Sequence, residues 1–184
     1  DFELRFRYRI RSGNGNSGVQ YRSQPKPGFG MRGYQADIEF GPTHTGMLYE
    51  EGGRGIMARR GEQVVIGKNG KRRVTGKLGE AGSLQLEIHT DGETWNRYRI
   101  VARGNRLQHF INDAPMIDAI DLDKRAAREG RIGLQVHQGP PMEIQFDSIE
   151  YRPLPAPQAE VEPAATTPTE TRQPLPHPRW IWAT

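Results

Sequence analysis

The sequence predicts an all-β fold made of many short strands, and three kinds of observation support this. Apolar and polar residues alternate with a period of two along much of the chain, as in half-buried antiparallel strands. The 184 residues include 22 glycines and 14 prolines, a content that suits frequent turns between short strands. No stretch shows the 3.6-residue periodicity of a long amphipathic helix.

The N-terminal half supplies several of the expected strands. Residues 2–11 alternate without interruption, so that Phe2, Leu4 and Phe6 share one face with Tyr8, while the charged residues take the other. A Gly/Asn loop follows, which is typical of a turn. Further strands are expected at 17–23, 33–40, 45–51, 63–66 and 83–90.

The stretch from Trp95 to Leu154 gives the clearest alternation in the chain. Asn112-Asp113 separates two of its strands and is predicted to form a hairpin turn. One helical turn at 124–128 is the only helix expected in this stretch. The residues expected to face the core are Tyr98, Ile100, Ala102, Leu107, His109, Ile111, Ile132, Leu134, Val136, Met142, Ile144 and Phe146.

Composition limits the possible functions. The chain has no cysteine, so disulfides and cysteine-ligated metals are excluded, and no apolar run reaches the length of a membrane span. The net charge of +4 is modest, and a period of two places arginines and aromatic rings on opposite faces of the first strand. A nucleic-acid platform needs both on one face, so no nucleic-acid partner is expected.

The composition changes sharply after Leu154. Residues 155–178 are rich in Pro, Ala, Thr and Glu, a mixture that cannot bury enough apolar area to fold, so a disordered linker is predicted. Residues 179–184 include Trp180-Ile181-Trp182, and this apolar cluster suggests the start of a further domain. One folded domain is therefore expected over residues 1–154.

Five motifs give the sequence a specific family resemblance. They are NSGVQYR, GYQADIE, TGMLYEEGGRG, WNRYRIVARGNRLQHFIND and GRIGLQVHQG followed by IEYRPL. In this order they resemble the bacterial 3-keto-disaccharide hydrolase domain family, formerly a domain of unknown function, from about Phe2 to Leu154.

The resemblance carries expectations about fold and activity. It implies a concanavalin A-like jelly-roll sandwich of two antiparallel sheets, with carbohydrate bound in a groove on the concave sheet. It implies cleavage of glycosides whose glucose unit is oxidised to a ketone at carbon three, in an extracytoplasmic (periplasmic or secreted) location. Members of the family usually carry further residues before the first strand seen here, so an N-terminally truncated jelly roll is expected, with one strand edge unpaired.

Polar residues spaced by two indicate where a sugar would bind. Within a strand, this spacing projects side chains from one face at intervals of about 7 Å. The candidates are Gln20 and Arg22, then Gln35, Asp37 and Glu39, and finally Gln135 and His137. A dense array of fixed donors and acceptors suits the many hydroxyls of a sugar. The alternative is an ordinary solvated outer face.

Two kinds of chemistry are compatible with these candidates. Asp37 and Glu39 are a possible carboxylate pair, but retaining jelly-roll glucanases carry a Glu-x-Asp-x-x-Glu strand that this chain lacks. On a keto sugar, a base can instead remove the proton on carbon two while an electrophile stabilises the enolate. We expect His137 or Asp37 as the base, with Arg22 or a bound divalent metal as the electrophile. Histidine spacing alone indicates no metal site.

A second candidate group follows the expected strand at 45–51. Tyr49, Glu50, Glu51 and Arg54 lie at its end and in the Gly-rich loop beyond it, where binding grooves are commonly lined. The alternative is a surface Glu–Arg ion pair of little energetic consequence.

Two functions therefore remain open from the sequence. One is an enzyme that cleaves keto-glycosides, and the other is a non-catalytic, lectin-like carbohydrate-binding module of a larger exported protein. The cofactor is unknown in either case.

Overall fold

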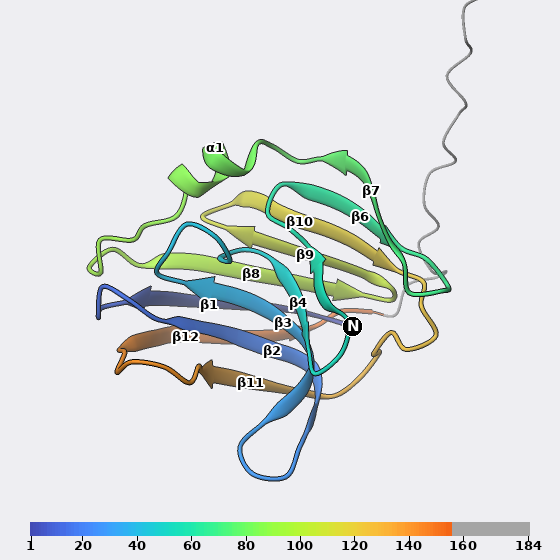
Figure 1. The fold of residues 1–184 in the computed structure, drawn as a ribbon, viewed down its shortest axis with the longest axis horizontal. Helices are drawn as coiled ribbons and strands as arrows, with labels where there is room; N and C mark the ends of the chain where they lie inside the picture. Colours follow the sequence, from blue (N-terminus) through green and yellow to red (C-terminus); the bar gives the residue numbers. More distant parts are fainter. Residues whose placement is uncertain (156–184) are drawn as a thin grey trace, which may run out of the picture.

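Residues 1–155 are described by a computed structural model, and they form two β-sheets packed face to face (Figure 1). One sheet has the spatial order β12 (Ile144–Pro153), β1 (Phe2–Ile10), β8 (Asn96–Arg103), β9 (Arg106–Ile111), β10 (Ala114–Asp121), β6 (Glu62–Ile66) and β7 (Arg72–Lys77). The other has the order β11 (Arg131–Val136), β2 (Asn16–Pro25), β3 (Met31–Glu39), β4 (Leu48–Glu51) and β5 (Gly55–Ala58). The predicted all-β jelly-roll sandwich is confirmed. The expected linker and further domain lie outside the described residues, apart from Pro155.

The chain crosses between the two sheets after β1, β5, β10 and β11. Neighbouring strands are antiparallel with one exception, because β6 pairs in parallel with β10. Parallel neighbours need a long connection, and here β7, β8 and β9 lie between them in the chain. The expectation of purely antiparallel sheets is therefore wrong for this pair. No helix within the described residues is long and apolar enough to cross a membrane.

Alternate residues of the strands fill the space between the sheets, as the period of two predicts. His109 of β9 is buried at the centre of this core. The Tyr21 hydroxyl lies 3.0 Å from its Nε2 atom and the Tyr98 hydroxyl 3.2 Å from its Nδ1 atom. Burial lowers the pKa of His109 to about 3, so this ring stays neutral in the core at neutral pH.

The expected strand at 83–90 is instead the short helix α1 (Ala81–Leu86) followed by a turn. Leu84 and Ile88 are buried while Leu86 is exposed, so the apolar contacts follow helical i, i+4 spacing rather than alternation. The helical turn expected at 124–128 is a non-helical turn.

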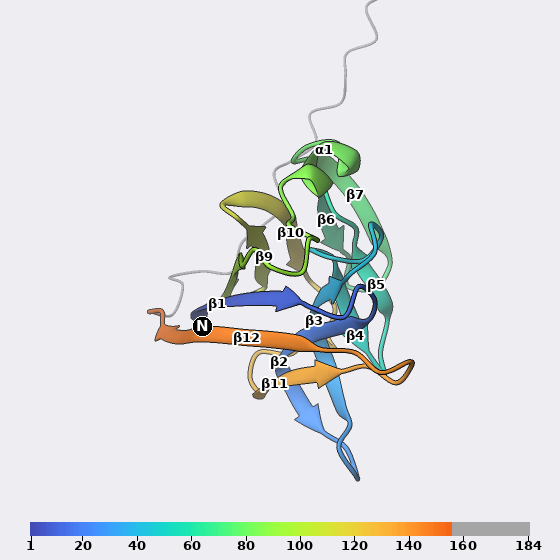
Figure 2. The same ribbon diagram turned by 90° about the vertical axis from the view of Figure 1, so that its left-hand side faces the viewer.

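One edge of the sandwich is open. Figure 2 shows β11 and β12 beside each other at this edge, each the outermost strand of its own sheet. Ile132, Leu134 and Val136 on β11 remain exposed, although the alternation predicts them to be core residues. Met142, Ile144 and Phe146 are only partly buried. Among residues 1–155, no further strand covers the interior at this edge, which is why these side chains keep contact with water.

Candidate functional site

A groove crosses the outer face of the five-stranded sheet, the face that points away from the core. Its volume is about 370 Å³. All five strands or the segments next to them contribute to it, so the whole sheet acts as its floor. We call it the outer-face groove, and its lining consists of Asn16, Gln35, Asp37, Glu39, His44, Tyr49, Glu51, Ile56, Gln135 and His137.

Strand register explains the shape of this floor. One row across the sheet contains Gly133, Gln20, Gln35, Tyr49 and Ile56, and the next contains Gln135, Gly18 and Asp37. Gly18 therefore separates Gln135 from Asp37 without filling the space between them. A Cβ atom at Gly18 would lie 2.7 Å from Cγ of Gln35, so this position has to be glycine for the Gln35 side chain to lie across it.

A chain of hydrogen bonds fixes the amides of the floor. The Ser23 hydroxyl donates to Gln20 Oε1 at 2.8 Å, and Gln20 Nε2 donates to Gln35 Oε1 at 2.6 Å. Gln35 Nε2 then donates to Asp37 Oδ1 at 2.6 Å and to Gln135 Oε1 at 3.3 Å. The orientation of each amide is thereby determined by the next, which leaves a rigid polar surface.

Asp37 is the least accessible acid of the groove, with 6% of its surface exposed. Burial raises its pKa to about 6, and the negative charges of Glu39 and Glu51 act in the same direction. The Gln35 hydrogen bond and His44 oppose this rise without cancelling it. Because no Lys or Arg side chain lines the groove in the described part of the chain, Asp37 has no strong cation to hold it ionised.

The other acids lie around Asp37 on neighbouring positions. Glu39 Oε2 accepts a hydrogen bond from the backbone N–H of His44 at 2.8 Å and lies 2.9 Å from His44 Nδ1. Glu51 and Tyr49 extend outward from β4 into the groove. Among residues 1–155, no three His, Asp or Glu side chains gather closely enough to hold a metal ion. The divalent metal considered from the sequence therefore has no preformed site in this part.

Gln135 and His137 border the groove on the β11 side. His137 follows the end of β11, is exposed, and its Nδ1 atom lies 2.6 Å from the Gln138 carbonyl oxygen. Both residues, together with Glu51, also line a second hollow of about 610 Å³. The two spaces are therefore adjacent and share one boundary, at which His137 and Glu51 are the ionisable groups.

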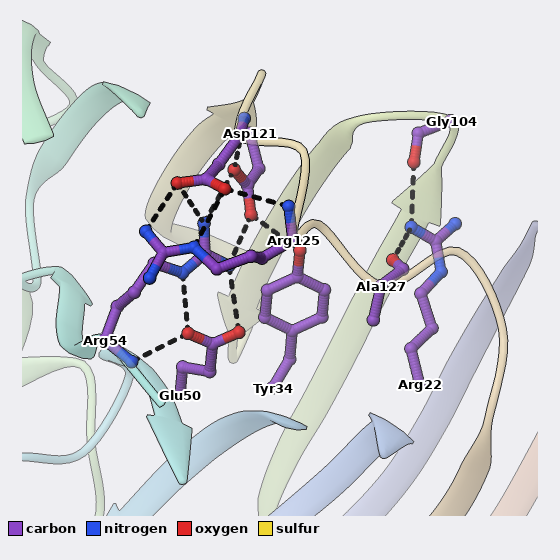
Figure 3. Close-up of polar contacts among 9 residues, drawn as sticks. Arg22, Tyr34, Glu50, Arg54, Gly104, Asp121, Arg125 and Ala127 are labelled. Atoms are coloured by element: carbon purple, nitrogen blue, oxygen red, sulfur yellow. Dashed lines mark hydrogen bonds and ion pairs between the residues drawn. The ribbon is translucent and has the colours of Figure 1, made fainter. Parts of the chain in front are cut away.

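Arg22 does not reach the groove, and its expected place beside Gln20 on the floor is wrong. A β-bulge after Tyr21 places Arg22 in the left-handed region with φ of 47°, which reverses the side chain direction. Its guanidinium donates to the Gly104 and Ala127 carbonyl oxygens at 2.8 and 3.3 Å (Figure 3). It also pairs with Asp1 at 3.0 Å. All of these partners belong to the folded domain itself, so the contacts of Arg22 stabilise the fold and do not face the groove.

Glu50 and Arg54 also lie outside the groove, contrary to expectation. They belong to a charged group between the sheets, most of which Figure 3 shows. We call it the Arg54 cluster, and its members are Tyr34, Glu50, Arg54, Asp121, Asp123 and Arg125. Arg54 donates to Glu50 Oε2 at 2.6 Å and to Asp121 Oδ2 at 2.8 Å. The interpretation as a weak surface pair is wrong as well, because the Arg54 side chain is only 9% exposed.

The structure thus gathers most of the predicted residues and adds others. Asp37, Gln35, Glu39, Tyr49, Glu51, Gln135 and His137 line the groove, and Gln20 supports its floor and lines the second hollow. Asn16, His44 and Ile56 were missed. Asn16 continues the two-residue spacing of Gly18 and Gln20, which is a usable signal, whereas His44 comes from a loop that alternation does not describe.

Comparison with solved structures supports the fold. The chain is similar to the carbohydrate-binding module CBM66 from Bacillus subtilis, with 18% identity and a TM-score of 0.52, over 83% of this chain and 75% of that one. A "Putative glycosyl hydrolase" from Parabacteroides distasonis ATCC 8503 has 17% identity and a TM-score of 0.47, over 83% and 78% of the two chains. At 18% identity, the similarity to CBM66 shows only that the two chains share a fold.

Comparison with curated proteins found no match. Comparison with protein families gave a match over residues 1–152, to the family described as the 3-keto-alpha-glucoside-1,2-lyase-like domain. This span includes every strand of both sheets except the last residue of β12, and it contains the whole outer-face groove. The chain therefore belongs to the family of 3-keto-alpha-glucoside-1,2-lyase-like domains.

Proposed function

We propose that the outer-face groove binds a glycoside oxidised to a ketone at carbon three of its glucose unit, and that Asp37 starts the cleavage of its glycosidic bond. The observation that carries this proposal is a buried carboxylate with a pKa of about 6 in a polar groove. A general base is most effective when its pKa lies near the working pH. Family membership supports the class of substrate.

The reaction follows from the acidity that a ketone confers on its neighbouring carbon. Asp37 takes the proton from carbon two, and the electron pair of that C–H bond moves toward the ketone to form an enolate. The pair then returns to form a double bond between carbons one and two, and the bond from carbon one to the glycosidic oxygen breaks. The departing oxygen takes up a proton, so that the elimination is balanced.

His137 is assigned the proton donor to that departing oxygen. It lies at the boundary between the groove and the second hollow, whereas Asp37 lines the groove alone. This arrangement separates the proposed base from the proposed acid along the groove. We assign Asp37 rather than His137 as the base, because burial raises the pKa of Asp37 while His137 is exposed.

The remaining polar groups are suited to hold the sugar. Within residues 1–155, the Tyr49 hydroxyl has no hydrogen-bond partner, so it is available to a ligand. The Gln135 amide nitrogen and the Glu39 carboxylate add a donor and an acceptor on either side of Asp37. Arg22 lies outside the groove, so we assign the stabilisation of the enolate oxygen to hydrogen bonds from groove side chains.

The test compares a 3-keto-glucoside with its unoxidised parent, each with and without a chelator. We expect release of the leaving group from the keto form only, and a loss of about 10²- to 10⁴-fold in Asp37→Asn. Asp113→Asn, in an exposed turn of the other sheet, is the matched control and should retain activity.

Three outcomes would change the assignment. Binding of the parent sugar without turnover of either compound supports a carbohydrate-binding module instead. Unchanged cleavage in Asp37→Asn contradicts the role of the base. Turnover that a chelator abolishes and a divalent cation restores transfers the electrophilic role to a metal ion.

An extracytoplasmic location is part of the proposal and is checked by fractionating cells that produce the full-length protein.

A further inference from the structure

We propose that the second hollow is a leaving-group subsite that takes an aromatic aglycone. The inference rests on the proposed function, since it assigns the groove to the keto sugar. The two spaces share Glu51, Gln135 and His137, and His137 is the proposed donor to the departing oxygen. The scissile bond would lie at that boundary, and whatever leaves must then occupy the second hollow.

Phe29 lines the second hollow and packs against no other side chain among residues 1–155. It lies at the tip of the hairpin that joins β2 to β3, which projects beyond the sandwich (Figures 1 and 2). Its side chain is fully exposed, at 110% of the reference area. A flat ring bound against it would gain the contact that stacked aromatic rings favour.

Other apolar side chains also line the second hollow. Met31 lies over Gly133, where an added Cβ atom would be 2.3 Å from the Met31 sulfur. The absence of a side chain at Gly133 therefore lets the thioether lie flat on β11, and thioethers make favourable contacts with aromatic rings. Leu134 and Val136 border the same hollow and are largely exposed.

Two polar residues of the second hollow, Gln20 and Lys26, favour a phenol over a second sugar. Gln20 is already bonded to Gln35 and Ser23, so it offers few free donors to hydroxyls. Lys26 lines the hollow and has no ion-pair partner within residues 1–155. A phenol leaves readily as an anion because its pKa is only about 10, and a nearby ammonium favours that charge. A departing sugar hydroxyl is far less acidic.

The test measures kcat/KM for 3-keto-glucosides with a phenyl, a methyl or a glucosyl leaving group. Each variant is compared with wild type on the same substrate, so that differences in leaving-group reactivity cancel. Phe29→Ala should lower kcat/KM for the phenyl substrate by about tenfold and leave the methyl substrate unchanged. Leu86→Ala removes a similarly exposed apolar side chain from α1 and is the control. Because Phe29 packs against no other side chain in the described part of the chain, Phe29→Ala should fold as wild type does.

Three kinetic outcomes would overturn the proposal. An equal loss on the phenyl and methyl substrates would show that Phe29 does not contact the leaving group. A loss confined to the glucosyl substrate would assign the hollow to a second sugar. An unchanged value for all three substrates would remove Phe29 from the site.

A binding experiment separates this proposal from the proposed function. Phenyl and methyl glucosides that have not been oxidised are titrated into wild type and Phe29→Ala, in both anomeric forms, and followed by NMR. Weaker phenyl glucoside binding in Phe29→Ala supports the subsite even if no keto-glycoside is cleaved. Equal binding by the two proteins overturns the subsite even if cleavage occurs.

Discussion

The outer-face groove and the Arg54 cluster are both rich in carboxylates, but their electrostatics are opposite. In the Arg54 cluster, burial alone would raise the pKa of Glu50, yet the hydrogen bonds and charge of Arg54 outweigh burial and lower it. In the groove, Asp37 faces two other acids and neutral amides, and its pKa rises to about 6. The comparison separates carboxylates that hold the sheets together from one that can exchange a proton near neutral pH.

Strand β4 contributes to both regions, and this explains why they are so different. Its pleat turns Glu50 inward to Arg54, while Tyr49 and Glu51 turn outward into the groove. Adjacent residues of one motif therefore belong to sites with different roles. Substitutions in the two regions should accordingly change different properties of the protein.

Removing the cation of the cluster should have the largest effect on stability. Arg54→Ala leaves Glu50 and Asp121 buried without their partner, which is expected to lower the free energy of unfolding by about 3–5 kcal/mol. Arg97→Ala is the control, because both side chains of its ion pair with Asp113 are exposed, at 66% and 83%, and the pair is therefore screened by water. Urea unfolding at neutral pH measures both, and similar losses in the two variants would contradict the comparison.

Neutralising Asp37 should instead stabilise the fold. The folded-state pKa of about 6 lies above the ordinary value of 3.8, so the folded protein binds this proton more tightly than the unfolded chain. Stability is therefore lost as the pH rises from 3.8 through 6. Asp37→Asn should raise the free energy of unfolding by roughly 3 kcal/mol at pH 7.

The gain should vanish below pH 3.8, where wild-type Asp37 is protonated in both states. Unfolding curves of wild type and Asp37→Asn at several pH values provide the measurement. A gain of the same size at low and neutral pH would mean that the carboxylate charge is not its cause.

The same titration should appear in the activity. If ionised Asp37 is the base, kcat/KM should fall about tenfold for each pH unit below 6. Glu39→Gln removes a neighbouring negative charge that raises this pKa, so it should move the acidic limb to lower pH. A pH–rate profile that is the same in wild type and Glu39→Gln would contradict the assignment of the limb to Asp37.

The smallest effect is expected from filling the gap in the floor. Gly18→Ala places a methyl group against the Gln35 side chain. This crowding should weaken binding of the sugar by about 1 kcal/mol, which is measured as a lower kcat/KM. Gly82→Ala in α1 is the control, since nothing lies within 4 Å of its added Cβ atom. Equal activities of wild type and Gly18→Ala would show that the sugar does not use this part of the floor.

Alternation predicted the regions where each strand is regular and both of its neighbours are present. In β1, β8 and β9 every predicted core position is buried, because regular strands paired on both sides keep their faces. The same rule correctly placed Gln35 and Asp37 opposite Tyr34 and Ile38 on β3.

The failures have identifiable physical causes. A single bulge redirected Arg22, since one extra residue reverses the face of the side chain. Tyr49, Glu50, Glu51 and Arg54 were predicted to line one surface. The pleat of β4 instead turns Glu50 inward to Arg54, while Tyr49 and Glu51 face the groove. For Ile132, Leu134 and Val136, alternation gave the correct face of β11 but could not show that β11 is an edge strand.

The sequence by itself determined the all-β class, the family, and the strand faces that hold Gln35, Asp37 and Gln135, because these depend on local periodicity and on motifs. Only the tertiary structure decided which charges meet. Asp37 acquires its raised pKa from burial and from Glu51 on another strand, and Arg54 is neutralised by Asp121 of the opposite sheet. Electrostatic interactions depend on distance and burial in three dimensions, and neither is visible in residue spacing along one strand.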